Sequence, residues 1–286
     1  MINRLIPLLF ILLFPSNIKS QDFLYQDYDW PEDPSVYVCP DSLLDKPEVT
    51  LLKKSIAEYG YIGDDFVERF VFHKVNYLSS DDAIESNNRV YLPIDADESL
   101  EVTKARVINP DGTVIELNKE DINKAEDEDG NVTFYYAFKG MVKGSIIEYF
   151  YIHKMPAQYT GVRYLIQNDN PQLNVDFEIV SPKNLVFTYM GKNGFGKMEV
   201  DTSDEHLNHL VRHFDYIVPF KPEPEAFIKP NVLQVLYKLS ANRATGKQDI
   251  ISYGSIADYI IGNYTVAEKK DNKIVAKWIK ESGAGK

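Results

Sequence analysis

Hydrophobic and polar residues alternate over short stretches in the middle of the chain, and a period of two is typical of β-strands. The clearest case is LNVDFEIV, residues 173–180. Its alternation predicts one apolar face formed by Leu173, Val175, Phe177 and Ile179. The same pattern in VTFYYAF predicts another, formed by Val132, Phe134, Tyr136 and Phe138. SIIEYFYIHKM (145–155) is apolar at odd and even positions alike, as expected of a central strand covered on both sides.

Turn signals separate these stretches at short intervals. VTKARVIN and TVIEL flank Pro110, Asp111 and Gly112, which predicts a hairpin, and DEDGN (127–131) predicts a second turn. EVTLLKKSIAEYGYI (48–62) remains ambiguous, because it contains helix formers as well as alternation. Since no helical run lies between most of these strands, we predict a mainly β fold, a large antiparallel β-sandwich, rather than a βαβ sheet.

The two ends of the chain differ from this middle part. Residues 1–20 contain a basic MINR, an apolar run and the small residue Ser20, so they predict a signal peptide cleaved after Ser20. The alternative is an uncleaved anchor, although the apolar run is too short to span a bilayer. Residues 21–47 predict an extended lead-in, 48–241 the sandwich domain, and 242–286 a helical linker or extension. We therefore expect an exported protein, periplasmic or extracellular, without a membrane span after cleavage.

Two proline-rich or charged stretches refine this division. PFKPEPEAF (219–227) predicts an extended segment suited to a sheet edge. Within the helical extension, VAEKKDNKIVAKWIKES predicts a charged helical stretch that carries Val275 and Trp278. Its modest apolar face would need a neighbouring domain to cover it.

Composition restricts the partners. The formal net charge is −12, and loss of the signal peptide removes two basic residues more, so we expect no nucleic-acid partner. Cys39 is the sole cysteine, which excludes an intramolecular disulfide even in an exported protein. With 44% hydrophobic residues, the chain can instead rely on its core.

The stretch EHLNHLVRH holds His206, His209 and His213 and is the main candidate for metal chemistry. As a helix capped by Ser203, it would place the three histidines on one polar side. As a strand that pairs back on GKMEV, it would place His209 and His213 on one face and His206 on the other. A zinc site would need the helix and a suitable ligand spacing, and no HExxH is present. We favour the strand, because its neighbours on both sides are strands.

The other candidates for chemistry are weaker. Cys39 lies between Val38 and Pro40 without a helix N-terminus to lower its pKa, so we expect no nucleophile there. GKNGFG (191–196) joins strands and predicts a flexible loop rather than a phosphate-binding loop. EDEDGN lacks the ligand spacing of a calcium loop. Asn131 and Asn263 begin glycosylation triplets, which are common by chance. We therefore predict no catalytic, cofactor-binding or metal-binding residues and no cofactor.

Several segments in order resemble one family. They are HKVNYLSSDDAIESNNRVYLP, KARVINPDGTVIEL, KGSIIEYFYIHK, YLIQNDNP and YMGKNGF. Together they resemble an exported bacterial domain of unknown function that precedes transglutaminase-like domains. The resemblance extends from about Glu48 to Ala241, and the hairpin around Gly112 and the GSIIEY strand are its strongest parts.

This resemblance implies a large β-sandwich, in which residues 48–59 and 207–217 are strands. It also implies that the family's chemistry lies downstream, in a papain-like fold with a Cys, His and Asp triad. No cysteine follows Cys39, so none of that triad can be assigned here. We therefore expect a non-enzymatic module that binds or positions a partner, either a downstream catalytic domain or another exported protein. The alternative is a fragment of a transglutaminase-like cysteine peptidase whose catalytic domain is missing from this sequence.

Overall fold

The computed structural model describes residues 23–94, 99–128, 130–221 and 228–264, together with Lys273 and Lys277. Strands dominate these residues, which confirms the predicted mainly β fold with a helix towards the C-terminus. Three predicted features lie outside the described residues: the signal peptide, most of the proline-rich run (222–227), and the segment with Val275 and Trp278.

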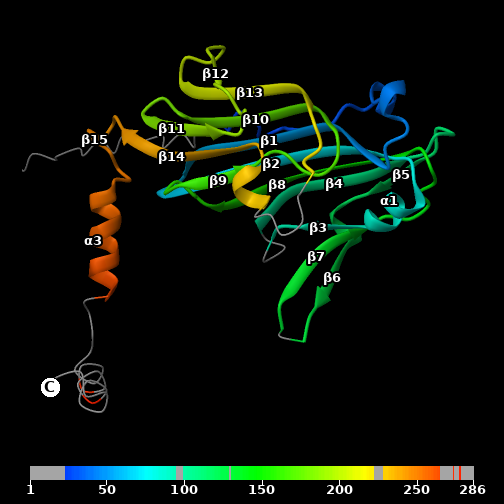
Figure 1. Cartoon of the computed structure of the whole chain (residues 1–286). Helices are drawn as coiled ribbons and strands as arrows, with labels where there is room; N and C mark the ends of the chain where they lie inside the picture. The colour runs from blue at the N-terminus through cyan, green and yellow to red at the C-terminus, as the bar shows by residue number, and fades with distance from the viewer. Residues whose placement is uncertain are drawn as a thin grey trace, which may run out of the picture.

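The largest sheet within the described residues has eight strands (Figure 1). In spatial order these are β12 (Glu199–Asp201), β13 (Leu207–Ile217), β10 (Gln172–Pro182), β1 (Glu48–Ile62), β2 (Asp65–Leu78), β8 (Ser145–Pro156), β4 (Leu100–Ile108) and β5 (Val114–Leu117). The ambiguous stretch 48–62 is thus a strand, and residues 145–155 form the predicted central strand, between β2 and β4. The predicted hairpin joins β4 to β5. One ladder differs from the rest, because β1 and β10 run parallel.

Two smaller sheets cover one face of the large sheet, which we call the inner face. The first contains β11 (Leu185–Lys192), β14 (Gln234–Asn242), β15 (Lys247–Gln248) and β9 (Val162–Leu165). The second contains β3 (Arg89–Leu92), β7 (Val132–Ala137) and β6 (Ile122–Glu126). Phe70 of β2 packs against the apolar clusters under both, so both lie on the same face.

Helices are short and lie outside the sheets. They are α1 (Asp81–Ser86), α2 (Ile228–Asn231), α3 (Tyr253–Tyr264) and the 3₁₀ turns Pro34–Val36, Asp41–Leu43 and Lys119–Asp121. The Ser80 hydroxyl caps α1 by accepting from the Ala83 amide at 3.1 Å. α3 extends away from the sheets (Figure 1).

The core is divided into two main apolar clusters on the inner face. Under the first small sheet, Phe177 and Phe195 pack with Tyr59 and Val235, and Tyr59 stacks on Phe187 at 4.3 Å between ring centroids. Under the second small sheet lies the predicted apolar face of β7, formed by Val132, Phe134, Tyr136 and Phe138. Because each buried aromatic removes a large apolar area from water, these clusters supply much of the fold's stability.

The opposite, outer face of the large sheet is covered by residues 23–44, which we call the N-terminal segment. Tyr25 and Tyr28 pack on a cluster that includes Ile56 and Val71. Tyr37 packs on a second cluster that includes Cys39. The predicted lead-in is therefore a cover for the sheet.

One detail of the β10 prediction is wrong. Val175, Phe177 and Ile179 belong to the inner-face core as expected, but Leu173 packs against the outer-face cluster around Cys39. The cause is Asn174, whose φ of 47° is left-handed and turns the strand between the two sets. The Asn174 side chain stabilises this turn by donating from Nδ2 to the Leu51 carbonyl at 3.0 Å.

Candidate functional site

The three histidines lie on or beside β13, which confirms the predicted strand and its pairing with GKMEV through β12. His209 and His213 lie on one face of this strand, opposite Val180 and Asp176 of β10. His206 precedes the strand and its side chain is 85% exposed. The stretch therefore does not gather three histidines at one point.

The two strand histidines contact different carboxylates. His209 Nε2 lies 2.7 Å from Glu178 Oε2, and its Nδ1 lies 3.4 Å from Asp201 Oδ2. His213 Nδ1 lies 2.7 Å from Asp176 Oδ1, and this contact raises the pKa of His213. Burial would raise the pKa of Glu178, but hydrogen bonds from His209 and Tyr25 outweigh it and lower that pKa. In the described part of the chain, no group of three or more His, Cys, Asp or Glu side chains is arranged to hold a metal ion.

Cys39 belongs to the N-terminal segment and is buried against β1. Its Sγ lies 3.8 Å from the Pro40 carbonyl, and it packs with Val49 and Leu51. Burial raises the pKa of the thiol, which disfavours the reactive thiolate.

The glycine-rich residues 191–196 form a packed turn that leaves β11. Gly191 lies so close to Phe195 that a Cβ would approach the ring to 2.6 Å. Asn193 adopts a φ of 56° and donates to the carbonyls of Pro230 and Val232 at 2.7 Å. These contacts fix the turn against the core, so its glycines serve packing, and the expected flexible loop is a fixed one.

The acidic turn before β7 is closed by its own side chains. The Asp127 carboxylate accepts from the Asn131 backbone amide at 2.8 Å and from Asn131 Nδ2 at 2.9 Å. Asn131 is exposed, and Asn263 lies in α3. Through these two hydrogen bonds, Asp127 fixes the conformation of the turn.

A buried ionic network lies between the outer face and the N-terminal segment. Glu148 is fully buried, and its carboxylate accepts from Arg106 Nε at 2.5 Å and from the Tyr37 hydroxyl at 2.6 Å. His73 Nε2 lies 2.8 Å from the same carboxylate, and its Nδ1 lies 2.7 Å from the Tyr28 hydroxyl. Sequence inspection missed this network, because residues bonded directly within it are up to 111 positions apart.

The same network continues over β1 and β10. Glu58 accepts from the backbone amides of Leu24 and Tyr25, and the Tyr25 hydroxyl donates to Glu178. Burial raises the pKa of Tyr25. The histidines and carboxylates of this face are thus occupied by structural partners, and the arrangement anchors the N-terminal segment rather than forming an open reaction centre.

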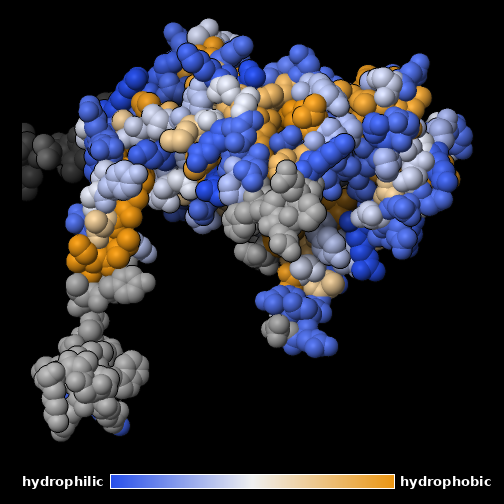
Figure 2. Space-filling model, in the orientation of Figure 1, coloured by the Kyte–Doolittle hydropathy of each residue, from blue (hydrophilic) through white to orange (hydrophobic). Residues whose placement is uncertain are grey.

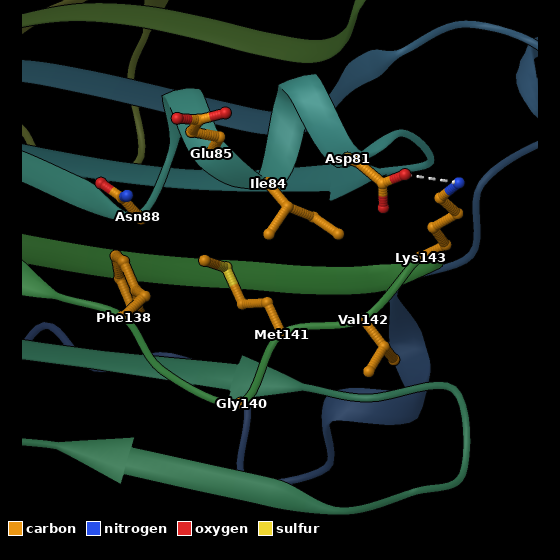
Figure 3. A pocket seen from close by; sticks show the side chains of 9 residues that line it. All are labelled: Asp81, Ile84, Glu85, Asn88, Phe138, Gly140, Met141, Val142 and Lys143. Carbon is orange, nitrogen blue, oxygen red and sulfur yellow. Dashed lines mark ion pairs between the residues drawn. The ribbon is translucent and has the colours of Figure 1, made fainter.

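An open cleft lies between α1 and the loop that precedes β8 (Figure 3). Its volume is about 570 Å³, and Asp81 and Lys143 form a 2.8 Å ion pair at one end. Figure 3 shows Ile84 and Met141 facing each other across the cleft. The lining residues include no serine, cysteine or histidine.

The surface of α3 is the second feature open to a partner. Tyr253 is 94% exposed and Tyr259 73%, and Ile256, Ile260 and Ile261 are about half exposed. Figure 2 shows an orange, apolar patch on α3, the helix that stands off the sandwich in Figure 1. Within the described residues, no helix is long and apolar enough to cross a membrane.

Comparison with known proteins places this fold in context. Among solved structures, a putative protease from Parabacteroides distasonis matches with a TM-score of 0.54 at 11% identity. The match covers 67% of this chain but 40% of that one, so the shared fold is less than half of the longer protein. No curated protein matches.

The family assignment comes from the sequence itself. Residues 65–214, more than half of the chain, match the family described as "Domain of Unknown Function with solved-structure structure (DUF3857)". This match confirms the resemblance to a domain of unknown function, whereas export and the order of domains stay predictions. The chain belongs to the DUF3857 family.

Proposed function

We propose that this domain is a non-catalytic module that binds or positions a neighbouring folded domain, and that α3 is its docking element. The apolar exposure of α3 carries this proposal. Asp258 is the one charged residue between Tyr253 and Tyr264, and the apolar side chains described for this helix are exposed rather than buried against the sandwich. A helix with an exposed apolar side is more stable in water when another element covers that side.

The partner that fits best is a folded domain joined to or exported with this one. In the putative protease, the shared fold accounts for 40% of a longer chain, which supports a fold that works beside further domains. The net charge of −12 favours a partner surface that is basic or neutral around its apolar patch. We place the protein outside the cytoplasm, because of the signal-like residues 1–20.

A second candidate is the front part of a transglutaminase-like cysteine peptidase. The structural similarity to a putative protease favours it. In that case the docking domain would carry the Cys, His and Asp triad, since no cysteine follows Cys39 in this sequence. Reading the coding region beyond Lys286 distinguishes the two candidates, because a downstream frame with this triad makes the domain part of such an enzyme.

The docking role itself can be tested by inserting charges into α3 and, as a control, into a strand far from it in the sequence. Ile256→Lys and Ile260→Lys together introduce two charges into α3, and Val200→Lys introduces one at a 63% exposed position on β12. We expect the α3 amides of the wild-type chain to exchange rapidly with deuterium when alone and slowly with the domain encoded beside it. The β12 variant should retain this protection and the α3 variant should lose it. Equal protection in both variants would refute the docking role.

A further inference from the structure

The cleft between α1 and residues 138–143 has apolar side chains on both walls. Ile84 extends into it from α1 and Met141 from the opposite loop (Figure 3), and the buried ring of Phe138 also lines it. Its volume of about 570 Å³ lies within the range of about 300–1,000 Å³ that is typical of ligand sites. An apolar side chain that enters such a cleft gains free energy by leaving water.

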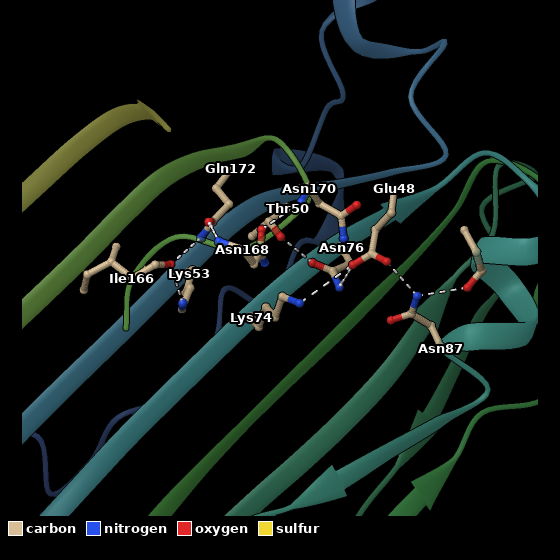
Figure 4. Close-up of polar contacts among 11 residues, drawn as sticks. Glu48, Thr50, Lys53, Lys74, Asn76, Asn87, Ile166, Asn168, Asn170 and Gln172 are labelled. Carbon is tan, nitrogen blue, oxygen red and sulfur yellow. Dashed lines mark hydrogen bonds and ion pairs between the residues drawn. The ribbon is translucent and has the colours of Figure 1, made fainter. Parts of the chain in front are cut away.

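The wall formed by α1 is held in place at both ends. The Ser80 hydroxyl caps its first turn. At the other end, Asn87 Nδ2 donates to the Ala83 carbonyl and to Glu48 Oε2, both at 2.9 Å (Figure 4). Asn76 Nδ2 of β2 donates to the other oxygen of Glu48 at 2.8 Å. These bonds tie α1 to β1 and β2.

The opposite wall is tied to the turn between β4 and β5 and to the start of β8. Asn109 Nδ2 donates to the Gly140 carbonyl at 3.0 Å. The Ser145 hydroxyl donates to Asn109 Oδ1 at 2.6 Å and accepts from the Val142 amide at 2.8 Å. Because both walls are fixed, they cannot close on each other to bury their apolar side chains. A ligand would therefore meet a cleft that is already formed, which lowers the entropy cost of binding.

The rim of the cleft carries an excess of negative charge. Among the lining residues, Asp81 and Glu85 are acidic and Lys143 is the one cation. Lys143 Nζ lies 2.8 Å from Asp81 Oδ2, and the carboxylates of Asp81 and Asp82 raise the pKa of Lys143. The Asp81–Lys143 pair is exposed to water, and Asp82 and Glu85 add two more exposed carboxylates on α1. A cationic ligand is therefore favoured over an anionic one.

The loop also offers its backbone to a ligand. Among the hydrogen bonds of the described residues, none uses the backbone N–H or C=O of Met141. We propose that the cleft binds an extended peptide segment of a partner protein, in which an aliphatic side chain stands beside lysine or arginine. The aliphatic side chain lies between Ile84 and Met141, and the basic side chains contact the carboxylates of α1. Methionine suits this contact, because its flexible thioether adapts to side chains of different shape.

The proposal can be tested by NMR with blocked five-residue peptides. The chain contains five methionines, so ¹³C-methyl labelling gives a simple spectrum, in which Met190 of β11, 59% exposed, is an internal control. We expect Gly-Lys-Leu-Lys-Gly to shift the Met141 signal but not the Met190 signal. Replacement of its leucine by serine should weaken binding about tenfold, because the apolar side chain is lost. Replacement of both lysines by glutamate should weaken binding at least about threefold.

Variants separate this cleft from unspecific binding. Met141→Lys places an ammonium in the cleft and should abolish the shift that the lysine–leucine peptide causes in the Ile84 methyl signal. The matched control Met190→Lys should retain that shift. A Met141 signal unmoved by this peptide would overturn the proposal, as would equal affinities for the three peptides.

The wild-type titration decides the matter even if Met141→Lys fails to fold. The cleft beside α1 and the helix α3 lie at opposite ends of the sandwich (Figure 1). Failure of the peptides to bind would therefore leave the docking role of α3 untouched, and loss of that role would not affect the cleft.

Discussion

Replacement of Glu148 by glutamine should destabilise the fold far more than any exposed Glu→Gln change. The substitution keeps the shape of the side chain and removes its charge. Glu148 has no exposed surface, and Arg106 and His73 both contact its carboxylate. A glutamine would leave the Arg106 guanidinium, whose side chain is 3% exposed, without a counter-charge. Its amide N–H groups would also face donors in place of an acceptor oxygen.

The expected magnitude follows from the burial of this pair. Loss of one partner of a buried ion pair costs about 3–5 kcal/mol, because the remaining charge stays buried and uncompensated. For a domain of this size, each kcal/mol lowers the melting temperature by about 2–4 °C. We therefore expect Glu148→Gln to lower it by about 6–20 °C. The matched control is Glu205→Gln, because Glu205 also lies near a histidine, at 4.0 Å, but its side chain is 89% exposed. That change should alter stability by about 0.5 kcal/mol or less.

The assay is thermal and urea unfolding followed by circular dichroism at pH 7, with limited proteolysis of the N-terminal segment as a second measurement. Because Tyr37 also donates to Glu148, the segment should be cleaved faster in Glu148→Gln than in Glu205→Gln. Arg106→Gln combined with Glu148→Gln should cost less than the sum of the single changes, since the two residues interact directly. Equal melting temperatures for Glu148→Gln and Glu205→Gln would refute the reasoning.

Two further substitutions test other parts of the fold. Burial raises the pKa of Glu68 from 4.5 to about 7, so the folded state binds this proton more tightly than the unfolded state. Its stabilising contribution is complete below pH 4.5 and is lost as the pH rises through about 7. Glu68→Gln should therefore flatten the fall in unfolding free energy over that range, measured by urea titration at each pH; an unchanged slope would contradict this. Gly191→Ala should cost about 1–3 kcal/mol, because its Cβ would lie 2.6 Å from Phe195, whereas Gly254→Ala meets its nearest atom at 3.6 Å and should be neutral. Equal unfolding midpoints for these two variants would contradict this expectation and show that Phe195 moves aside without cost.

Local sequence patterns predicted the strands well, because each strand's alternation reflects its own two faces. The apolar face of β7 and the central position of β8 follow from periods within a dozen residues. The strand at His209 was predicted from its neighbours, and its side chains lie as a period of two requires. These features depend on residues close together in the sequence.

Pairing between distant strands could not be predicted in the same way. Nothing in residues 48–62 or 172–182 indicates that β1 and β10 pair in parallel, since parallel pairing depends on the path of the chain between them. The error at Leu173 has a local cause, because Asn174 tolerates the left-handed conformation that moves Leu173 to the other face. An asparagine within the alternating strand was the available signal.

The N-terminal segment buries histidines and acids on the outer face of the large sheet that strand periodicity alone would assign to solvent. In a strand with one apolar face, charged residues on the other are normally assigned to water. Here His73 and Glu148 are buried, because tyrosines of the N-terminal segment lie over them and bond to them. Lys53 is buried by the same kind of distant contact, on the inner face, where the carbonyl that accepts its hydrogen bond lies 113 residues away. Which charged residues are buried in this protein thus depends on segments that cover them from far away in the sequence, and strand periodicity cannot predict those segments. The aromatic content of residues 23–37 was a sequence signal that such a cover exists. Large aromatic side chains are mostly buried in folded proteins, so an exposed linker would rarely contain so many of them.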